Sequence, residues 1–164
     1  MLAALMPVAA ACGELRSEVA PDSPLAEARI SSEALAQAAL EALAARSDSA
    51  LAALMITREE YETLLWPVLP DREHMSFAFV WSVTGPRSRS ARRNVLGELG
   101  GAPLELVRVE LSDDVEPYGA FTLYRGARMT VRDTQTGQTG MIPLMDALVE
   151  MEGGWKFMNF RDDL

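Results

Sequence analysis

One stretch decides the predicted fold: residues 150–160 read Glu-Met-Glu-Gly-Gly-Trp-Lys-Phe-Met-Asn-Phe. The two adjacent glycines allow the tight turn of a β-hairpin, and the alternating apolar side chains after them are typical of a strand with one buried face. The strand before the turn is predicted to run from about residue 140 to 151. We therefore expect an antiparallel hairpin here.

Working back from the hairpin, the pattern stays extended as far as Pro103. Further strands are predicted over residues 104–111, 118–125 and 127–133. The first of these alternates, with Val107, Val109 and Leu111 on its apolar side. Together with the hairpin they predict an antiparallel meander.

Before Pro103 the sequence is rich in alanine and predicts about five helical segments. Ser31 or Ser32 caps the first, which runs to about Arg46, and Asp48 can cap a short second one. A third begins at the sequence Thr57-Arg58-Glu59-Glu60, a capping box in which the threonine hydroxyl and the second glutamate satisfy unpaired backbone donors.

The last two predicted helices are separated by a break. One starts at Asp71 and ends where Gly85-Pro86 interrupts it. The other is capped by Ser88 or Ser90 and closes at Gly100-Gly101. Helices followed by antiparallel strands predict an α+β fold, with the N-terminal helices packed on a curved sheet of about four to five strands.

The order of these elements, with the turn Glu152-Gly153-Gly154-Trp155-Lys156, resembles the nuclear transport factor two-like, cystatin-like α+β roll. Its bacterial lipoprotein members of unknown function look closest. The resemblance covers about residues 31–164 and implies a cone-like cavity between sheet and helices. Members of that family bind small molecules there, catalyse isomerase or dehydratase reactions, or act as protein-binding modules.

The N-terminal residues predict a membrane anchor. Residues 2–11 are wholly apolar, too few for a spanning helix but suited to a signal peptide. Ala9-Ala10-Ala11 before Cys12 resembles a bacterial lipobox, which implies lipidation of Cys12. We therefore expect a signal peptide over 1–12, a flexible tether over 13–30, one domain over 31–164, and a location in the bacterial cell envelope facing outside the cytoplasm. The alternative is a buried thiol in a cytoplasmic protein.

Composition excludes several classes of function. The 164 residues carry a formal net charge of -9, which disfavours nucleic-acid binding, and one cysteine and one histidine exclude a disulfide framework and a multi-histidine metal site. The sequence shows no phosphate-binding glycine loop and no nucleophile elbow. We therefore expect no cofactor and no metal.

Asp146 is the candidate catalytic carboxylate. On an alternating strand it would share a face with Ile142, Leu144 and Leu148, where burial would raise its pKa and suit it to act as a general base. Steroid isomerase-like members of the resembling family pair such a carboxylate with a tyrosine, which Tyr118 or Tyr124 could supply. The alternative is a solvated Asp146, or one paired with Arg108 or Arg125.

Two other groups of side chains are candidate binding residues. The only basic cluster could hold an anion, or could be a solvated loop paired with Asp113, Asp114 and Glu116; its members are Arg87, Arg89, Arg92 and Arg93. Large aromatic residues line either the core or a ligand cavity. The candidates for lining the cavity are Trp66, Phe77, Trp81, Tyr124 and Trp155.

These observations favour a non-catalytic, lipid-anchored envelope domain that binds a small apolar ligand or a protein partner. Two alternatives remain at this stage. One is an isomerase- or dehydratase-like enzyme that uses Asp146 as base. The other is a structural module that forms a homodimer through its open sheet face.

Overall fold

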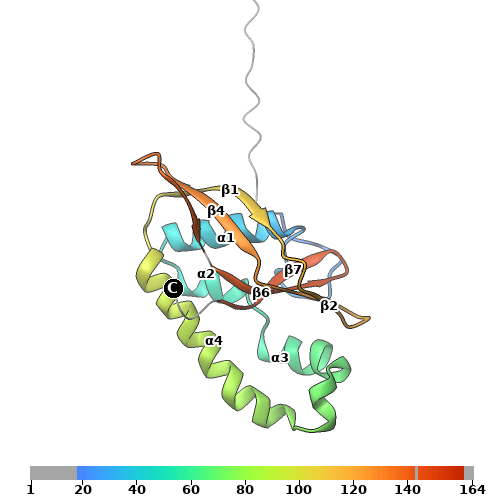
Figure 1. Ribbon diagram of the computed structural model, residues 1–164. Helices are drawn as coiled ribbons and strands as arrows, with labels where there is room; N and C mark the ends of the chain where they lie inside the picture. Colours follow the sequence, from blue (N-terminus) through green and yellow to red (C-terminus); the bar gives the residue numbers. More distant parts are fainter. Residues whose placement is uncertain (1–17, 143, 161–164) are drawn as a thin grey trace, which may run out of the picture.

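The computed structural model of the protein describes residues 18–142 and 144–160. Helices come first and strands follow, which confirms the α+β class (Figure 1). The described strands form two antiparallel sheets, one in the order β1-β4-β5 and the other in the order β2-β3-β6-β7. The count of described strands exceeds the four to five predicted for two reasons: β2 was not predicted, and the strand expected over 140–151 is divided into β5 and β6.

The helical elements are α1 (Ser32–Ala44), α2 (Asp48–Ala53), α3 (Arg58–Glu60), η1 (Tyr61–Leu65), η2 (Trp66–Val68), η3 (Pro70–Glu73) and α4 (Phe77–Leu99). Ser31 caps α1, and the predicted capping box of Thr57 and Glu60 is present at the start of α3. From Tyr61 the helical path continues as a π-helix and then as two 3-10 turns. Gly100 caps the end of α4, as the sequence predicted.

α4 corrects the prediction of two helices separated by Gly85-Pro86. A single helix of 23 residues begins after its cap Ser76 and continues through Pro86. Proline removes one backbone hydrogen bond, but Ala91 and Val95 on the following turns are buried in the core. Tertiary packing of these turns therefore outweighs the helix-breaking tendency of the proline. Figure 1 shows α4 beginning near α3 and running diagonally along one side of the molecule to the level of α2.

The strands are β1 (Leu104–Glu110), β2 (Val115–Pro117), β3 (Thr122–Arg125), β4 (Arg128–Asp133), β5 (Thr139–Ile142), β6 (Met145–Met151) and β7 (Gly154–Phe160). A register shift between Leu106 and Arg108 interrupts β1, and Val107 in this bulge is 45% exposed. The predicted apolar side is therefore wrong for Val107 and for Leu111, which is 40% exposed, and right for Val109. The side chains that pack on the core are Leu104, Leu106 and Val109.

The β6–β7 hairpin is buried on both faces. One face carries Leu148 and Phe157 into a core shared with α1 and α2. The other face carries Val149 and Met151 into a second core. The turn between the strands is formed by Glu152 and Gly153, which both have positive φ angles of 49° and 76°. Two such residues give the turn type that matches the twist of a hairpin. The hairpin lies where the sequence predicted it, but its turn is centred on Glu152 and Gly153 and not on the two glycines, since Gly154 begins β7.

Residues 18–30 correct the expected tether. Arg29 pairs with Trp155 of β7 through two backbone hydrogen bonds of 3.0 and 2.7 Å. Leu25 and Ala28 are buried, and the Ser23 hydroxyl donates to the carbonyl of Met151 at 3.0 Å. The folded part of the chain therefore begins by residue 18. The lipobox and Cys12 lie outside the described residues.

Candidate functional site

A pocket of about 400 Å³ lies between α4 and the four-stranded sheet. We call it the α4 pocket and define it by its lining residues, which are Ile56, Tyr61, Trp81, Thr84, Arg87, Ser88, Ala91, Leu123, Arg125, Asp146, Ala147, Met158, Asn159 and Phe160. Its volume falls within the range of roughly 300–1,000 Å³ that is usual for small-molecule pockets. The floor is mainly apolar, and polar groups come from both sides.

One face of α4 forms the helical wall of the pocket. Trp81, Thr84, Ser88 and Ala91 recur at intervals of three or four residues, which places them on the same side of the helix. Gly85 lies against the indole of Trp81, and a Cβ atom added there would be 3.1 Å from the ring. Glycine at this position therefore leaves room for the indole.

Aromatic side chains support this wall. Of the five predicted lining aromatics, only Trp81 lines the α4 pocket. Trp66 and Phe77 instead pack against Tyr61, with ring centroids 6.4 and 6.0 Å from it. Tyr61 lines the pocket and was not among the predicted residues; burial raises the pKa of its phenol. Tyr61 lies at the start of the short π-helix η1, where it is buried.

Tyr124 and Trp155 are not brought to the pocket. Their rings pack on each other at a centroid distance of 4.9 Å, against the core shared with α1 and α2. Both residues are absent from the pocket lining. They therefore do not line the α4 pocket, and a cavity lined by them stays a prediction.

Asp146 lines the α4 pocket, but not as a buried base. Register shifts on both sides of Ala147 distort β6, and Asp146 is exposed between buried neighbours. Its carboxylate accepts a hydrogen bond of 2.6 Å from the side-chain amide of Asn159. The predicted face shared with Leu144 and Leu148 is wrong, because a bulge exchanges the faces of the side chains around it.

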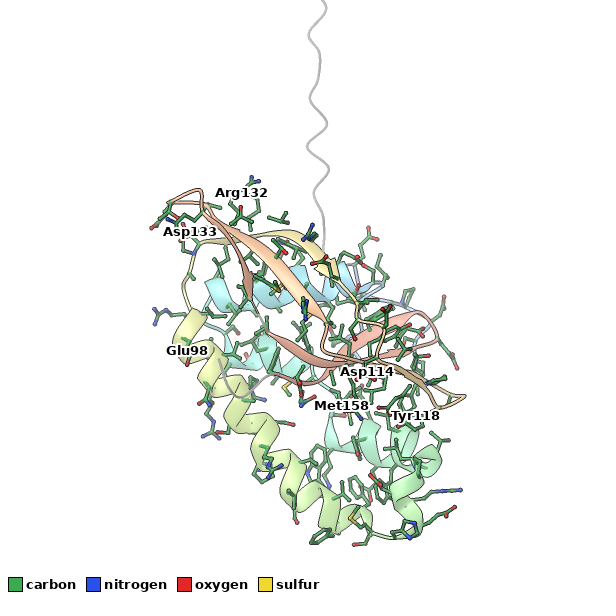
Figure 2. All side chains as sticks on the ribbon, in the orientation of Figure 1. Glu98, Asp114, Tyr118, Arg132, Asp133 and Met158 are labelled. Carbon is green, nitrogen blue, oxygen red and sulfur yellow. The ribbon has the colours of Figure 1, made fainter. Side chains whose placement is uncertain are left out.

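The two tyrosines expected beside Asp146 lie elsewhere. Tyr118 donates a hydrogen bond to Glu116, which raises the pKa of the phenol. It lies near the β2–β3 hairpin (Figure 2), and Tyr124 packs on Trp155. Neither tyrosine lines the α4 pocket, so the carboxylate and phenol of the enzyme hypothesis are not brought together.

The basic cluster is divided between different surroundings on α4. Arg87 lines the α4 pocket. Arg92 forms a two-pronged ion pair with Asp48, at 2.7 and 3.0 Å, and Arg89 and Arg93 are exposed. The predicted solvated loop is therefore a helix. Arg125 of β3 joins Arg87 in the lining, and its Nε donates to Glu116 at 2.6 Å.

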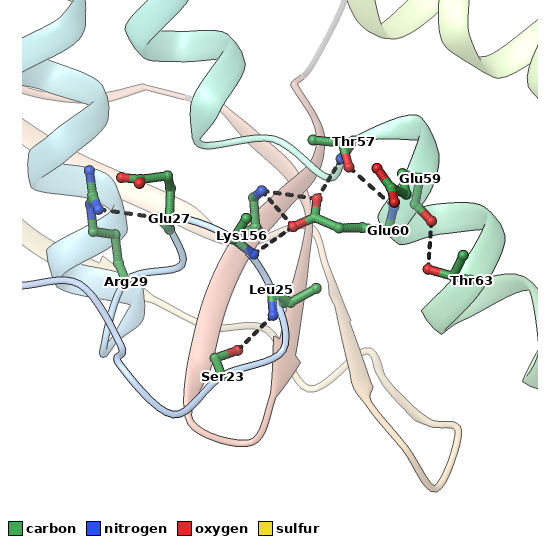
Figure 3. Close-up of polar contacts among 10 residues, drawn as sticks. Ser23, Leu25, Glu27, Arg29, Thr57, Glu59, Glu60, Thr63 and Lys156 are labelled. Carbon is green, nitrogen blue, oxygen red and sulfur yellow. Dashed lines mark hydrogen bonds and ion pairs between the residues drawn. The ribbon is translucent and has the colours of Figure 1, made fainter.

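A buried ion pair joins α3 to β7 (Figure 3). The ammonium of Lys156 lies 3.0 Å from both carboxylate oxygens of Glu60. Glu60 also accepts hydrogen bonds from the backbone amides of Ala26 and Thr57, at 2.8 and 2.7 Å. The pair joins the residue before Tyr61 to the strand that carries Met158. Sequence reasoning did not identify it, although Lys156 is the only lysine in the chain.

Within residues 18–142 and 144–160, no group of acidic, cysteine or histidine side chains is arranged to hold a metal ion. In the same residues no helix is both long and apolar enough to cross a bilayer. No family model, curated protein or solved structure matches the chain.

Proposed function

We propose that this protein is a non-catalytic domain that binds a small apolar or amphipathic molecule in the α4 pocket. The observation that carries the proposal is the pocket itself, of about 400 Å³, with an apolar floor and polar side chains at its sides. An apolar surface of this kind favours removal of a ligand's hydrocarbon from water. Asp146 is exposed and accepts a hydrogen bond from Asn159, so it lacks the desolvation expected of a general base, and this supports binding over catalysis.

Two serines on α4 offer a matched test. Ser88 lines the α4 pocket and Ser90 is exposed on the same helix. A tryptophan at position 88 would fill the pocket, whereas one at position 90 would point into solvent. Binding of decan-1-ol is measured by titration calorimetry, with circular dichroism to check the folding of each variant.

The proposal predicts that the wild-type protein and the Ser90→Trp variant bind decan-1-ol, and that Ser88→Trp abolishes binding while the helical signal is retained. Equal binding by both variants would place the ligand elsewhere. No binding by the wild-type protein would contradict the proposed function for this ligand class.

We also infer that the domain is tethered to a bacterial envelope membrane by a lipid on Cys12. The support is the apolar stretch that ends in Ala9-Ala10-Ala11-Cys12. Intact mass after expression in a bacterium, beside a Cys12→Ser control, tests this inference. A chain that begins at Cys12 with added acyl mass is expected, and an unprocessed chain with a free thiol would refute it.

A further inference from the structure

Two arginine side chains reach the α4 pocket from opposite walls. Arg87 comes from α4, and Arg125 comes from the end of β3. Among the described side chains, no carboxylate forms an ion pair with Arg87. Arg125 bonds to Glu116 through Nε, and its two terminal nitrogens have no hydrogen bond to any described residue. Both guanidinium groups can therefore donate to a ligand.

The pocket differs in charge from the rest of the protein. Two arginines and a single carboxylate, Asp146, line it, whereas the whole chain has a formal net charge of -9. The Asp146 carboxylate is already engaged by the amide of Asn159. The lining side chains carry two positive charges and one negative charge, and Glu116, outside the lining, is bound to Arg125. The guanidinium of Arg87 has no carboxylate partner among the described residues, and this favours an anion over a cation beside it.

Apolar surface lies next to these cations. Trp81 stands one helical turn from Thr84 and two from Arg87 and Ser88, and Leu123 lies two residues before Arg125 on β3. Met158 and Phe160 of β7 complete the apolar floor. A ligand that satisfies both parts of the lining carries an anionic group at one end and a hydrocarbon chain at the other.

We propose that the ligand of the α4 pocket is a single-chain anionic amphiphile, whose carboxylate or phosphate is bound by Arg87 and by the terminal nitrogens of Arg125. This inference rests on the proposed function and names its ligand class. A planar guanidinium donates two parallel hydrogen bonds to either headgroup, and such charge-assisted bonds are stronger than neutral ones.

Three probes with hydrocarbon chains of the same length separate the contribution of the headgroup charge from that of the hydrocarbon. Decanoate, decyl phosphate and decan-1-ol are titrated into the full chain, below the concentrations at which they form micelles, with calorimetric detection. We expect either anion to bind at least about tenfold more tightly than the alcohol. The tighter of the two anions identifies the headgroup. Equal affinity for the alcohol and both anions would overturn the inference while leaving the proposed function intact.

Arginine variants test the residues. Arg87→Gln and Arg125→Gln each remove a cation from the lining. Arg93→Gln removes another exposed cation, which lies on the same helix as Arg87 but outside the lining. Each of the first two is expected to weaken binding of the preferred anion about tenfold and to leave decan-1-ol unaffected. Arg93→Gln should leave the binding of both the preferred anion and decan-1-ol unchanged. Anion binding that is unchanged in both Arg87→Gln and Arg125→Gln would overturn the assignment.

Discussion

The ammonium of Lys156 and the carboxylate of Glu60 form a buried ion pair in which Nζ lies 3.0 Å from each carboxylate oxygen. The exposed fractions of the two side chains are 1% and 9%. Burial lowers the pKa of Lys156, and the negative charge of Glu60 offsets part of that effect. The pair ties α3 to β7, and through the bond from Ala26 it also holds residues 18–30. Of these three segments, β7 contributes Met158, Asn159 and Phe160 to the lining of the α4 pocket.

Removal of the ammonium should be strongly destabilising. Lys156→Met leaves the Glu60 carboxylate buried without its partner, at an expected cost of about 3–5 kcal/mol in the free energy of unfolding. Urea unfolding measures this cost. The control is Arg58→Met, since Arg58 and Glu62 form an exposed pair at 3.9 Å that should contribute less than about 1 kcal/mol. Similar losses of unfolding free energy in the two variants would show that the buried pair contributes no more to stability than the exposed one.

Gly154 allows the close approach of residues 18–30 to β7. A Cβ atom added there would lie 2.9 Å from the Cβ of Ala28 and nearer still to the side chain of Ser23. Gly154→Ala is therefore expected to cost about 1–3 kcal/mol through overpacking. Gly97, in α4, has no neighbour within 4 Å of an added Cβ, so Gly97→Ala should stabilise the protein by up to about 1 kcal/mol. The midpoint of thermal unfolding measures both effects. A midpoint that shifts in the same direction for Gly154→Ala and Gly97→Ala would contradict this packing.

The contact between α2 and α4 should depend on pH. The hydrogen bonds from Arg92 hold the pKa of Asp48 below its ordinary value of 3.8. A lowered carboxyl pKa means that the pair stabilises the fold above that value and loses its effect as the pH falls through the folded-state pKa. Because the Asp48 side chain is 49% exposed, the expected contribution is below about 1 kcal/mol.

Arg92→Gln tests this contact. Its deficit in unfolding free energy relative to wild type should be present at about pH 6 and should shrink below about pH 3. Urea unfolding of both proteins at the two pH values measures the difference. If the deficit in unfolding free energy is the same at both pH values, the effect of Arg92 comes from packing and not from its ion pair.

Asp146 offers a test of the anionic ligand proposed for the α4 pocket. If the α4 pocket holds an anion, Asp146→Asn removes a like charge and should strengthen decanoate binding by about twofold to tenfold. The Asn159 amide can still donate to the new side-chain carbonyl. Weaker binding of decanoate by this variant would contradict the anionic assignment and would instead favour a ligand that donates to the carboxylate.

Local signals in the sequence predicted their elements well. The capping box of Thr57 and Glu60, the cap at Ser31 and the position of the β6–β7 hairpin turn depend on residues within four positions of one another. Their hydrogen bonds are determined by the local backbone, so residue type and spacing suffice to identify them. The α+β order followed from the change of pattern at Pro103.

Features that depend on distant contacts were missed. Pro86 was read as a helix end because the burial of Ala91 and Val95, which holds α4 together, is not visible in local sequence. This error hid the pocket wall, since a continuous helix would have placed Trp81, Ser88 and Ala91 on one face. The bulges beside Val107 and Asp146 each shifted the expected face of a strand, and alternation alone does not reveal where a bulge falls.

The most direct test of the α4 pocket is a titration of ¹⁵N-labelled protein with decanoate, followed by amide and indole NMR signals. The chain has three tryptophans, of which only Trp81 lines the pocket. We expect the indole signal of Trp81 to shift, together with the amide signals of Leu123 and Met158, while the indole signal of Trp155 does not shift. Shifts confined to residues outside the pocket lining, or no shifts at any site, would contradict it.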